Sequence, residues 1–260
     1  MELVIVIIIV GILSVLGGSI ITTSIEGYLD MSRRAELVGS AGSALRRMQR
    51  DVRSALPNSI PPPYGNVNEI RFVYAPSGGR YRAQTDESGT GDVLRFGDSD
   101  ENGTDVIGSL YKNASGQVPE EVQNGAFVVG NTNPNDVYSG KNMAQIENIN
   151  SAGDHIQFNS TRFSPKYRSP TQRFSIATSE VRYAIEGNRL VRYERDDSNI
   201  GGSNWETQAL VTRHVVESKS EFTYHPGTPW RTALLTLKLT LQDEGESISL
   251  LHEVHVLNTP

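Results

Sequence analysis

The spacing of hydrophobic residues changes near residue 57, from a helical spacing before it to short alternating stretches after it. Residues 3–25 carry no charge and are rich in Ile, Val and Leu, which is long enough for a helix to cross a bilayer core of roughly 30 Å. Further along, apolar residues recur at spacings of three and four, which predicts a narrow apolar stripe on a polar helix. The stripe consists of Val38, Ala41, Leu45, Met48, Val52 and Leu56. We expect one helix over residues 2–56, with a transmembrane half at 1–25 and an amphipathic half at 26–57 that packs on the rest of the protein.

After Pro57 and the Pro61–Pro63 run, apolar and polar residues alternate in short stretches broken by Gly, Asn, Asp and Pro. This pattern predicts β-strands joined by turns. The strands are expected at residues 69–75, 181–185, 190–193, 233–241 and 247–256. Residues 77–153 are dense in Gly, Asn, Asp and Ser, which predicts a loop-rich insertion. The sequence therefore predicts an α+β fold, in which a long helix carries a β-rich head at residues 58–260.

Charge and cysteine content exclude some classes of function. The chain has 24 Lys and Arg against 30 Asp and Glu, so its charge gives no reason to expect nucleic acid as a partner. Cysteine is absent, which excludes disulfides and thiolate metal sites.

Motifs for catalysis fail on spacing. The pair His252 and His255 is one residue short of the zinc-protease pattern and lies in a predicted strand, where positions three apart face opposite sides. No complete phosphate loop, dinucleotide loop or serine nucleophile elbow occurs. We therefore expect a protein that is not an enzyme and has no small-molecule substrate.

One acidic segment has the spacing of a calcium loop. Oxygen-bearing side chains occupy alternate positions before Gly103, as in the first half of such a loop. The candidate ligands are Asp98, Asp100, Asn102 and Asp105. The closing glutamate of the motif is replaced by Ser109, so two alternatives stay open. The segment is either a solvated acidic turn or a calcium site completed by other residues of the head.

The N-terminus carries the most specific pattern. Glu2 places a carboxylate at the mouth of an apolar helix, which is costly in lipid unless the carboxylate has a partner. The segment Glu2–Ile7 and the apolar run to Leu16 resemble the start of type IV pilins and of type II secretion pseudopilins. In that family a prepilin peptidase removes a basic leader that ends in glycine, and the new N-terminus is methylated. The resemblance implies that Glu2 neutralises the N-terminal amine of a neighbouring subunit during assembly.

Relative to that family, the chain begins late. The leader, its glycine and the first four mature residues are missing, and Met1 stands where the residue before the glutamate is expected. The resemblance implies either a start codon upstream of Met1 or a trimmed chain.

Two further segments narrow the resemblance. Residues Leu45–Arg53 and the hairpin Val181–Arg192 are similar to J-type minor pseudopilins, and the size and the ending Leu251–Pro260 are similar to minor pilin-like proteins of mannose-sensitive haemagglutinin (MSHA) pilus biogenesis. This implies a single-pass protein of the bacterial inner membrane with a periplasmic head, incorporated into a surface filament. Its partners would be other minor and major pilin-like subunits and the inner-membrane assembly platform.

Three functions are consistent with these features. The first is a minor pilin-like subunit that initiates, primes or caps assembly of a type IV, MSHA-type pilus. The second is a tip component of a type II secretion pseudopilus. The third is a membrane-anchored periplasmic binding domain unrelated to pilins.

Overall fold

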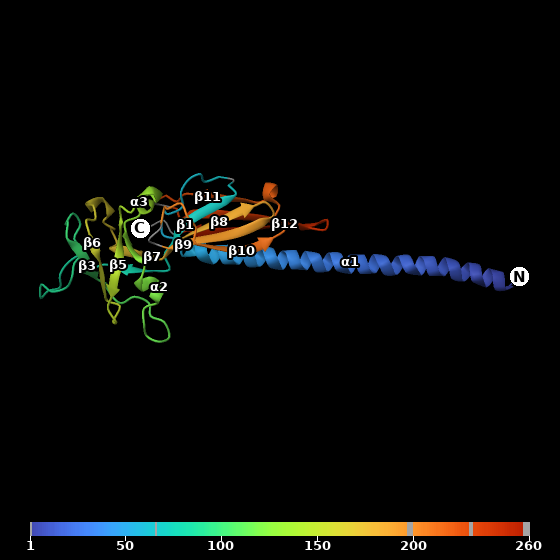
Figure 1. The fold of residues 1–260 in the computed structure, drawn as a ribbon, viewed down its shortest axis with the longest axis horizontal. Helices are drawn as coiled ribbons and strands as arrows, with labels where there is room; N and C mark the ends of the chain where they lie inside the picture. Colours follow the sequence, from blue (N-terminus) through green and yellow to red (C-terminus); the bar gives the residue numbers. More distant parts are fainter. Residues whose placement is uncertain (1, 66, 197–199, 229–230, 257–260) are drawn as a thin grey trace.

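A single long helix and a β-rich head make up the computed structural model (Figure 1). The model describes residues 2–65, 67–196, 200–228 and 231–256, and the side chains of 15–22 and 160 are outside this description. Helix α1 (Glu2–Arg53) has 52 residues, so at 1.5 Å per residue it is about 78 Å long. Basic residues Arg50 and Arg53 occupy its last turn, where they complement the helix dipole. The predicted α+β class is confirmed, and the helix ends three residues before the predicted limit.

The first sheet of the head has the strand order β1-β8-β9-β10, with every neighbouring pair antiparallel. Its strands are β1 (Glu69–Tyr74), β8 (Ser179–Glu186), β9 (Arg189–Asp196) and β10 (Thr207–Arg213). The predicted hairpin is confirmed: β8 and β9 are joined at Gly187-Asn188, where Gly187 has a φ of 61°. A glycine suits this turn because positive φ strains other residues.

The second sheet contains β11 (Glu221–His225), β12 (Ala233–Asp243) and β13 (Glu246–Val256) in that order. The strand pairing predicted for residues 233–241 and 247–256 is confirmed as β12 and β13. Isolated bridges from Val67 to Phe222 and from Val215 to Leu241 connect this sheet to the chain around the first one. Both sheets contribute to one core with the C-terminal half of α1.

A third sheet occupies the segment that was expected to be a loop-rich insertion over residues 77–153. Its order is β2-β7-β4-β5-β6-β3, and the unit runs to residue 177. The strands are β2 (Ser77–Arg80), β3 (Glu101–Asp105), β4 (Ala126–Val129), β5 (Met143–Ile149), β6 (His155–Thr161) and β7 (Arg173–Ala177). Short helices α2 (Glu120–Gln123), α3 (Pro134–Tyr138) and η1 (Pro165–Tyr167) connect them, and η3 (Glu217–Lys219) belongs to the head outside this unit. Long connecting segments separate these short elements within residues 77–153, and the sheet continues beyond residue 153 through β6 and β7.

The insertion has a core of its own, built around aromatic rings. Phe127 stacks between Phe158 and Phe174, with ring centroids 4.9 and 4.8 Å apart. Offset stacking of this kind adds to the burial of apolar area. Short strands of four to seven residues thus share one core, and Figure 1 shows this unit at the end of the molecule away from the projecting helix.

The insertion leaves the rest of the head at one place. Tyr74 at the end of β1 is the register partner of Ser179 at the start of β8, so the chain exits and returns side by side. Small apolar side chains fill the junction: Leu56, Val73, Ala126, Val128, Val137 and Ala177. Amide side chains tie the two parts, since Asn58 donates to the carbonyl of Asn131 at 2.8 Å and Asn131 donates to the carbonyl of Pro57 at 2.7 Å.

A buried ion pair lies beside the junction. Glu180 on β8 and Arg195 on β9 are 0% and 1% exposed, and Arg195 Nη2 lies 2.6 Å from Glu180 Oε2. The same oxygen accepts a hydrogen bond from the backbone N–H of Gly201 at 2.9 Å. Trp205 covers the guanidinium, 4.2 Å from its ring centroid. Burial of this kind requires that each charge keep its partner.

Candidate functional site

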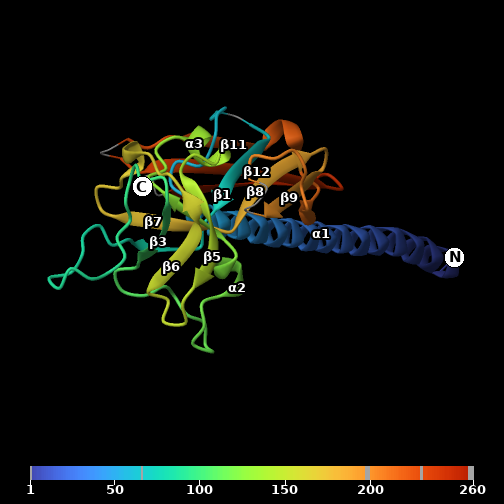
Figure 2. The ribbon, with the colours of Figure 1, turned by 60° about the vertical axis from the view of Figure 1, so that its left-hand side comes forward.

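The N-terminal part of α1 projects from the head as a free rod (Figures 1 and 2). Its large apolar side chains between Leu3 and Leu13 are 50–72% exposed, on all sides of the helix. Exposed apolar surface of this extent marks a contact with another protein or with lipid. Glu2 stands in the first turn and is exposed.

The projecting part contains most of the segment that was expected to span a membrane, residues 1–25. Met1 and the side chains of residues 15–22 lie outside the described residues. Within the described part of the chain, no helix offers an apolar stretch sufficient for a membrane crossing.

The C-terminal half of α1 is docked on the head by an apolar seam. The seam consists of Leu37, Ala41, Ala44, Leu45, Met48 and Val52, which pack in the core with β10, β12 and β13. Four of the six residues predicted for the stripe, Ala41, Leu45, Met48 and Val52, are fully buried. The prediction was wrong for Val38, which is 43% exposed, because the helical period of 3.6 brings Leu37 to the head instead. Leu56 is buried beyond the helix end, in the junction with the insertion.

A polar contact fixes the angle of the docked half. Asp51 accepts hydrogen bonds from Tyr183 Oη at 2.7 Å and from Arg192 Nε at 2.8 Å. Burial and the neighbouring Asp51 carboxylate raise the pKa of Tyr183, so its hydroxyl stays a donor. Glu194 also accepts a hydrogen bond from Arg192. Burial alone would raise the pKa of Glu194, but the hydrogen bond from Arg192 outweighs burial and lowers this pKa. The helix is therefore held by charge-assisted bonds as well as by apolar packing.

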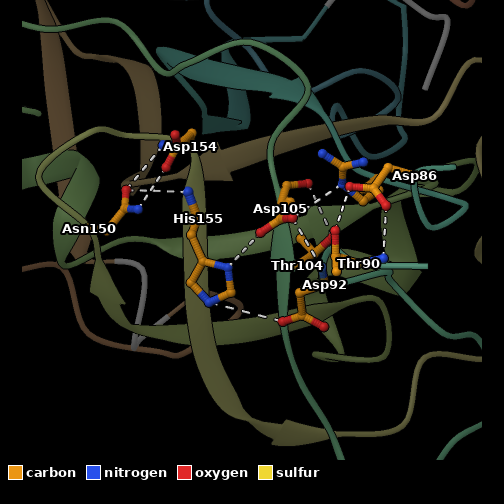
Figure 3. Close-up of polar contacts among 9 residues, drawn as sticks. Asp86, Thr90, Asp92, Thr104, Asp105, Asn150, Asp154 and His155 are labelled. Atoms are coloured by element: carbon orange, nitrogen blue, oxygen red, sulfur yellow. Dashed lines mark hydrogen bonds and ion pairs between the residues drawn. The ribbon is translucent and has the colours of Figure 1, made fainter. Parts of the chain in front are cut away.

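A polar cluster of the insertion lies around β3 and β6 (Figure 3). Figure 3 shows the His155 ring between two carboxylates, with Nδ1 3.0 Å from Asp105 Oδ1 and Nε2 4.0 Å from Asp92 Oδ2. Arg82 Nε lies 3.2 Å from the other oxygen of Asp105, which also accepts the backbone N–H of Asp92 at 3.0 Å. The second ring nitrogen thus faces a carboxylate rather than a hydroxyl that it could activate. The arrangement ties the loop after β2 to the sheet by charge.

The four candidate calcium ligands do not converge. Asp98 and Asp100 lie in an exposed loop, where Asp98 Oδ1 accepts the backbone N–H of Asp100 at 3.2 Å. Asn102 is exposed on β3, and the carboxylate of Asp105 is engaged by Arg82 and His155. Among the residues described here, no group of three or more His, Asp or Glu side chains is placed to hold a metal ion. For Asn102 and Asp105, strand geometry explains the separation, since positions three apart on β3 face opposite sides.

The cluster around Asp105 predicts a pH effect on stability. Burial raises the pKa of Asp105, but hydrogen bonds from His155 and the Asp92 backbone and the charge of Arg82 outweigh it and lower the pKa below its usual range. In the unfolded chain the pKa of an Asp is about 3.9. Between the lower pKa of the folded protein and the higher pKa of the unfolded chain, the unfolded state binds more protons. The stability that Asp105 contributes is therefore lost as pH falls through the folded pKa. We expect Asp105→Asn to cost about 1–2 kcal/mol at pH 5 and nothing at acid pH well below 4.

Urea denaturation of both proteins at several pH values below 5 measures this difference. Asp100→Asn, in the exposed loop, is the matched control and should leave stability unchanged at every pH. A cost for Asp105→Asn that persists undiminished at the lowest pH would contradict the assignment.

Sequence reasoning identified Asp105 but missed its partners. Arg82 and His155 stand far from it along the chain and share no motif with it. The pairing of β3 with β6 brings His155 to Asp105, and a backbone hydrogen bond from Arg82 to Asp105 places the arginine. The sequence also did not reveal the buried pair of Glu180 and Arg195. The register of the predicted hairpin, extended beyond its ends at Val181 and Arg192, was the available signal, because Glu180 pairs directly with Arg195.

The chain thus combines a projecting apolar helix, a docked half and a head with an inserted sheet. No family model, curated protein or solved structure matches this chain.

Proposed function

We propose that this protein is a minor pilin-like subunit that helps to initiate, prime or cap assembly of a type IV, MSHA-type pilus. One observation carries the proposal: α1 is a single helix whose second half is built into the core of the head while its first half projects with apolar side chains exposed all round. A helix that is apolar on every side requires an apolar surrounding on every side. Lipid provides this before assembly, and the helices of neighbouring subunits provide it in a filament.

The energetics favour a permanent partner for the projecting half. Exposed apolar surface costs about 25 cal/mol for each Å² left in water. The ten described apolar residues from Leu3 to Leu13 are each at least half exposed, so insertion or helix packing would recover a large free energy. Under this proposal residues 1–25 anchor the protein in the bacterial inner membrane as a single pass. The head then lies in the periplasm, beyond the charged residues that begin at Glu26.

The docked half suits a subunit that is pulled into a filament. The apolar seam and the bonds from Asp51 to Tyr183 and Arg192 fix the head rigidly on the helix. Helix contacts with neighbouring subunits and with the assembly platform would then set the position of the head. The same geometry serves a tip subunit of a type II secretion pseudopilus, and copurifying partners distinguish the two systems.

Glu2 provides the first test of this proposal. We expect Glu2→Ala to insert in the membrane at the wild-type level but to enter filaments poorly, because an N-terminal amine of a neighbour would lose its counter-charge. Carbonate extraction of membranes measures insertion, and immunoblots of sheared filaments measure incorporation. The protein should be expressed in its own cells from its full upstream region.

Glu26→Ala is the matched control, since Glu26 is an exposed carboxylate of the same helix beyond the uncharged segment. It should leave both measurements unchanged. Equal incorporation of Glu2→Ala and the wild type would refute the assembly role of Glu2. An N-terminal sequence of the native protein that shows no methylated residue would argue instead for a simple anchored periplasmic domain.

A further inference from the structure

We propose that the cavity between the end of α1 and the outer face of the inserted sheet binds an oxyanion with two or more negative charges. The cavity has a volume of about 400 Å³, which is within the usual range for small-ligand sites. Its lining includes three arginines from three elements: Arg53 from α1, Arg80 from β2 and Arg173 from β7. The inference does not depend on the filament proposal, because it rests on the head and the docked end of α1.

The strand register places two of these arginines side by side. Arg80 and Arg173 are direct partners in the antiparallel pair β2–β7, so their side chains share one face of the sheet. Phe174 and Ile176 face the opposite side, in the core of the insertion. Like charges directly opposite each other on a sheet are destabilising. Such a pair is therefore costly unless negative charge is supplied nearby.

The protein itself supplies no such charge at this place. The lining of the cavity contains no Asp or Glu. In the described parts of the chain, none of the three arginines takes part in an ion pair, although the protein has a net charge of −6. Arg80 uses its Nε to donate to the carbonyl of Thr171 at 3.2 Å, which leaves its terminal N–H groups for a ligand.

The rest of the lining combines apolar side chains, such as Leu56 and Val128, with small polar residues. Ser54 and Ser175 add hydroxyl groups, and Gly78, the register partner of Ser175, leaves room above the strand. A Cβ on Gly78 would approach the carbonyl oxygen of Phe174 to 2.6 Å, so only glycine fits that part of β2.

Asn131 forms another wall of the cavity and is bound from two sides. It donates to the carbonyl of Pro57, and its own Oδ1 accepts a hydrogen bond from Asn142 at 3.1 Å. A cavity with fixed walls loses little entropy when it binds a ligand.

Guanidinium groups select the chemical class of the ligand. Each presents paired N–H donors that match the two oxygens of a carboxylate or of a phosphate. Three such groups around one cavity fit a ligand with several oxyanion groups, either a polycarboxylate or a phosphate compound. Backbone and serine donors around them add hydrogen bonds without charge.

Isothermal titration of the full chain in an uncharged detergent tests this site. Citrate is the probe for the polycarboxylate and pyrophosphate for the phosphate compound, each at constant ionic strength set with NaCl. We expect saturable binding of at least one of them. Arg80→Gln/Arg173→Gln should weaken it by about tenfold for each arginine removed, since a hydrogen bond to a charged group contributes roughly 1.5–3 kcal/mol.

Arg189→Gln is the matched control, because Arg189 is an exposed strand arginine that does not line the cavity. It should bind as the wild type does. The double variant should unfold at the wild-type temperature or above without ligand, since it removes a like-charge pair. Binding of citrate alone would assign the site to carboxylates, and binding of pyrophosphate alone to phosphates. Absence of saturable binding for both, or equal binding by the double variant, would overturn the proposal.

Discussion

Replacement of Glu180 by glutamine is expected to lower the free energy of unfolding by about 3–5 kcal/mol. The carboxylate is fully buried, and Arg195 beside it is 1% exposed, so the change leaves a buried guanidinium without its counter-charge. Arg71 Nη1 lies 3.7 Å from the other oxygen of Glu180 and loses a partner as well. Urea denaturation of the full chain in uncharged detergent, followed by far-UV circular dichroism, measures the loss. Fluorescence of a Trp230→Phe background, in which Trp205 is the remaining tryptophan, reports on the environment of Arg195.

Glu221→Gln is the matched control for this experiment. Glu221 forms an ion pair with Lys238 at 3.2 Å, but both side chains are more than a third exposed. Exposed pairs contribute about 0–1 kcal/mol, so this change should have little effect. The double change Glu180→Leu/Arg195→Met, which removes both buried charges, should recover much of the lost stability. A cost for Glu180→Gln no larger than that for Glu221→Gln would show that the buried pair is not held as described.

The second large effect is expected at the seam between α1 and the head. Leu45→Ala should cost about 2–5 kcal/mol, because Leu45 is fully buried and its truncation leaves a cavity between the helix and the sheets. The measurement is the same urea titration. Because the seam holds α1 on the head, weakening it should also expose the segment after α1, around Pro57, to faster proteolysis.

Val38→Ala tests which face of α1 packs on the head. Val38 is one turn from the seam residue Ala41 but 43% exposed, so its truncation should change stability by less than about 0.5 kcal/mol. If Val38→Ala proved as costly as Leu45→Ala, the helix would be docked on a different face from the one described.

Local pattern was sufficient to predict the helix and most strands outside the insertion, but it did not predict β10 and β11. The spacing of Ala41, Leu45, Met48 and Val52 predicted a buried face because a helix must repeat every 3.6 residues. The alternation in β12 and β13 predicted a pair because a sheet buries every second residue. Val38 shows the limit of this reasoning. Positions 37 and 38 lie four and three residues before Ala41, so either fits the helical spacing, and only packing against the head decides which one is buried.

The insertion was harder to predict because its strands are short and its loops are rich in turn residues. A four-residue strand such as β4 contains two periods of alternation, and all its residues are buried, so no alternation is visible. Its stability comes from contacts between distant residues, such as Phe127 with Phe158 and Phe174.

The polar sites depend on the same long-range pairing. Arg53, Arg80 and Arg173 share no motif and reach one cavity only after β2 pairs with β7. The Asp105 cluster likewise requires β3 to lie beside β6. Spacing along the chain reveals a site only when one element supplies all its residues, as in a calcium loop.

The attachment of the insertion at Tyr74 and Ser179 has a mechanical consequence. The chain leaves the rest of the head after Tyr74 and returns at its register partner Ser179, so the insertion is a side branch. A pull along α1 is transmitted by shear through the apolar seam and the bonds of Asp51 to β12, β13 and β9. That load path does not pass through the inserted sheet. The branch can therefore change in size or sequence, or carry a bound ligand, while the tensile strength of the helix-to-head connection stays the same.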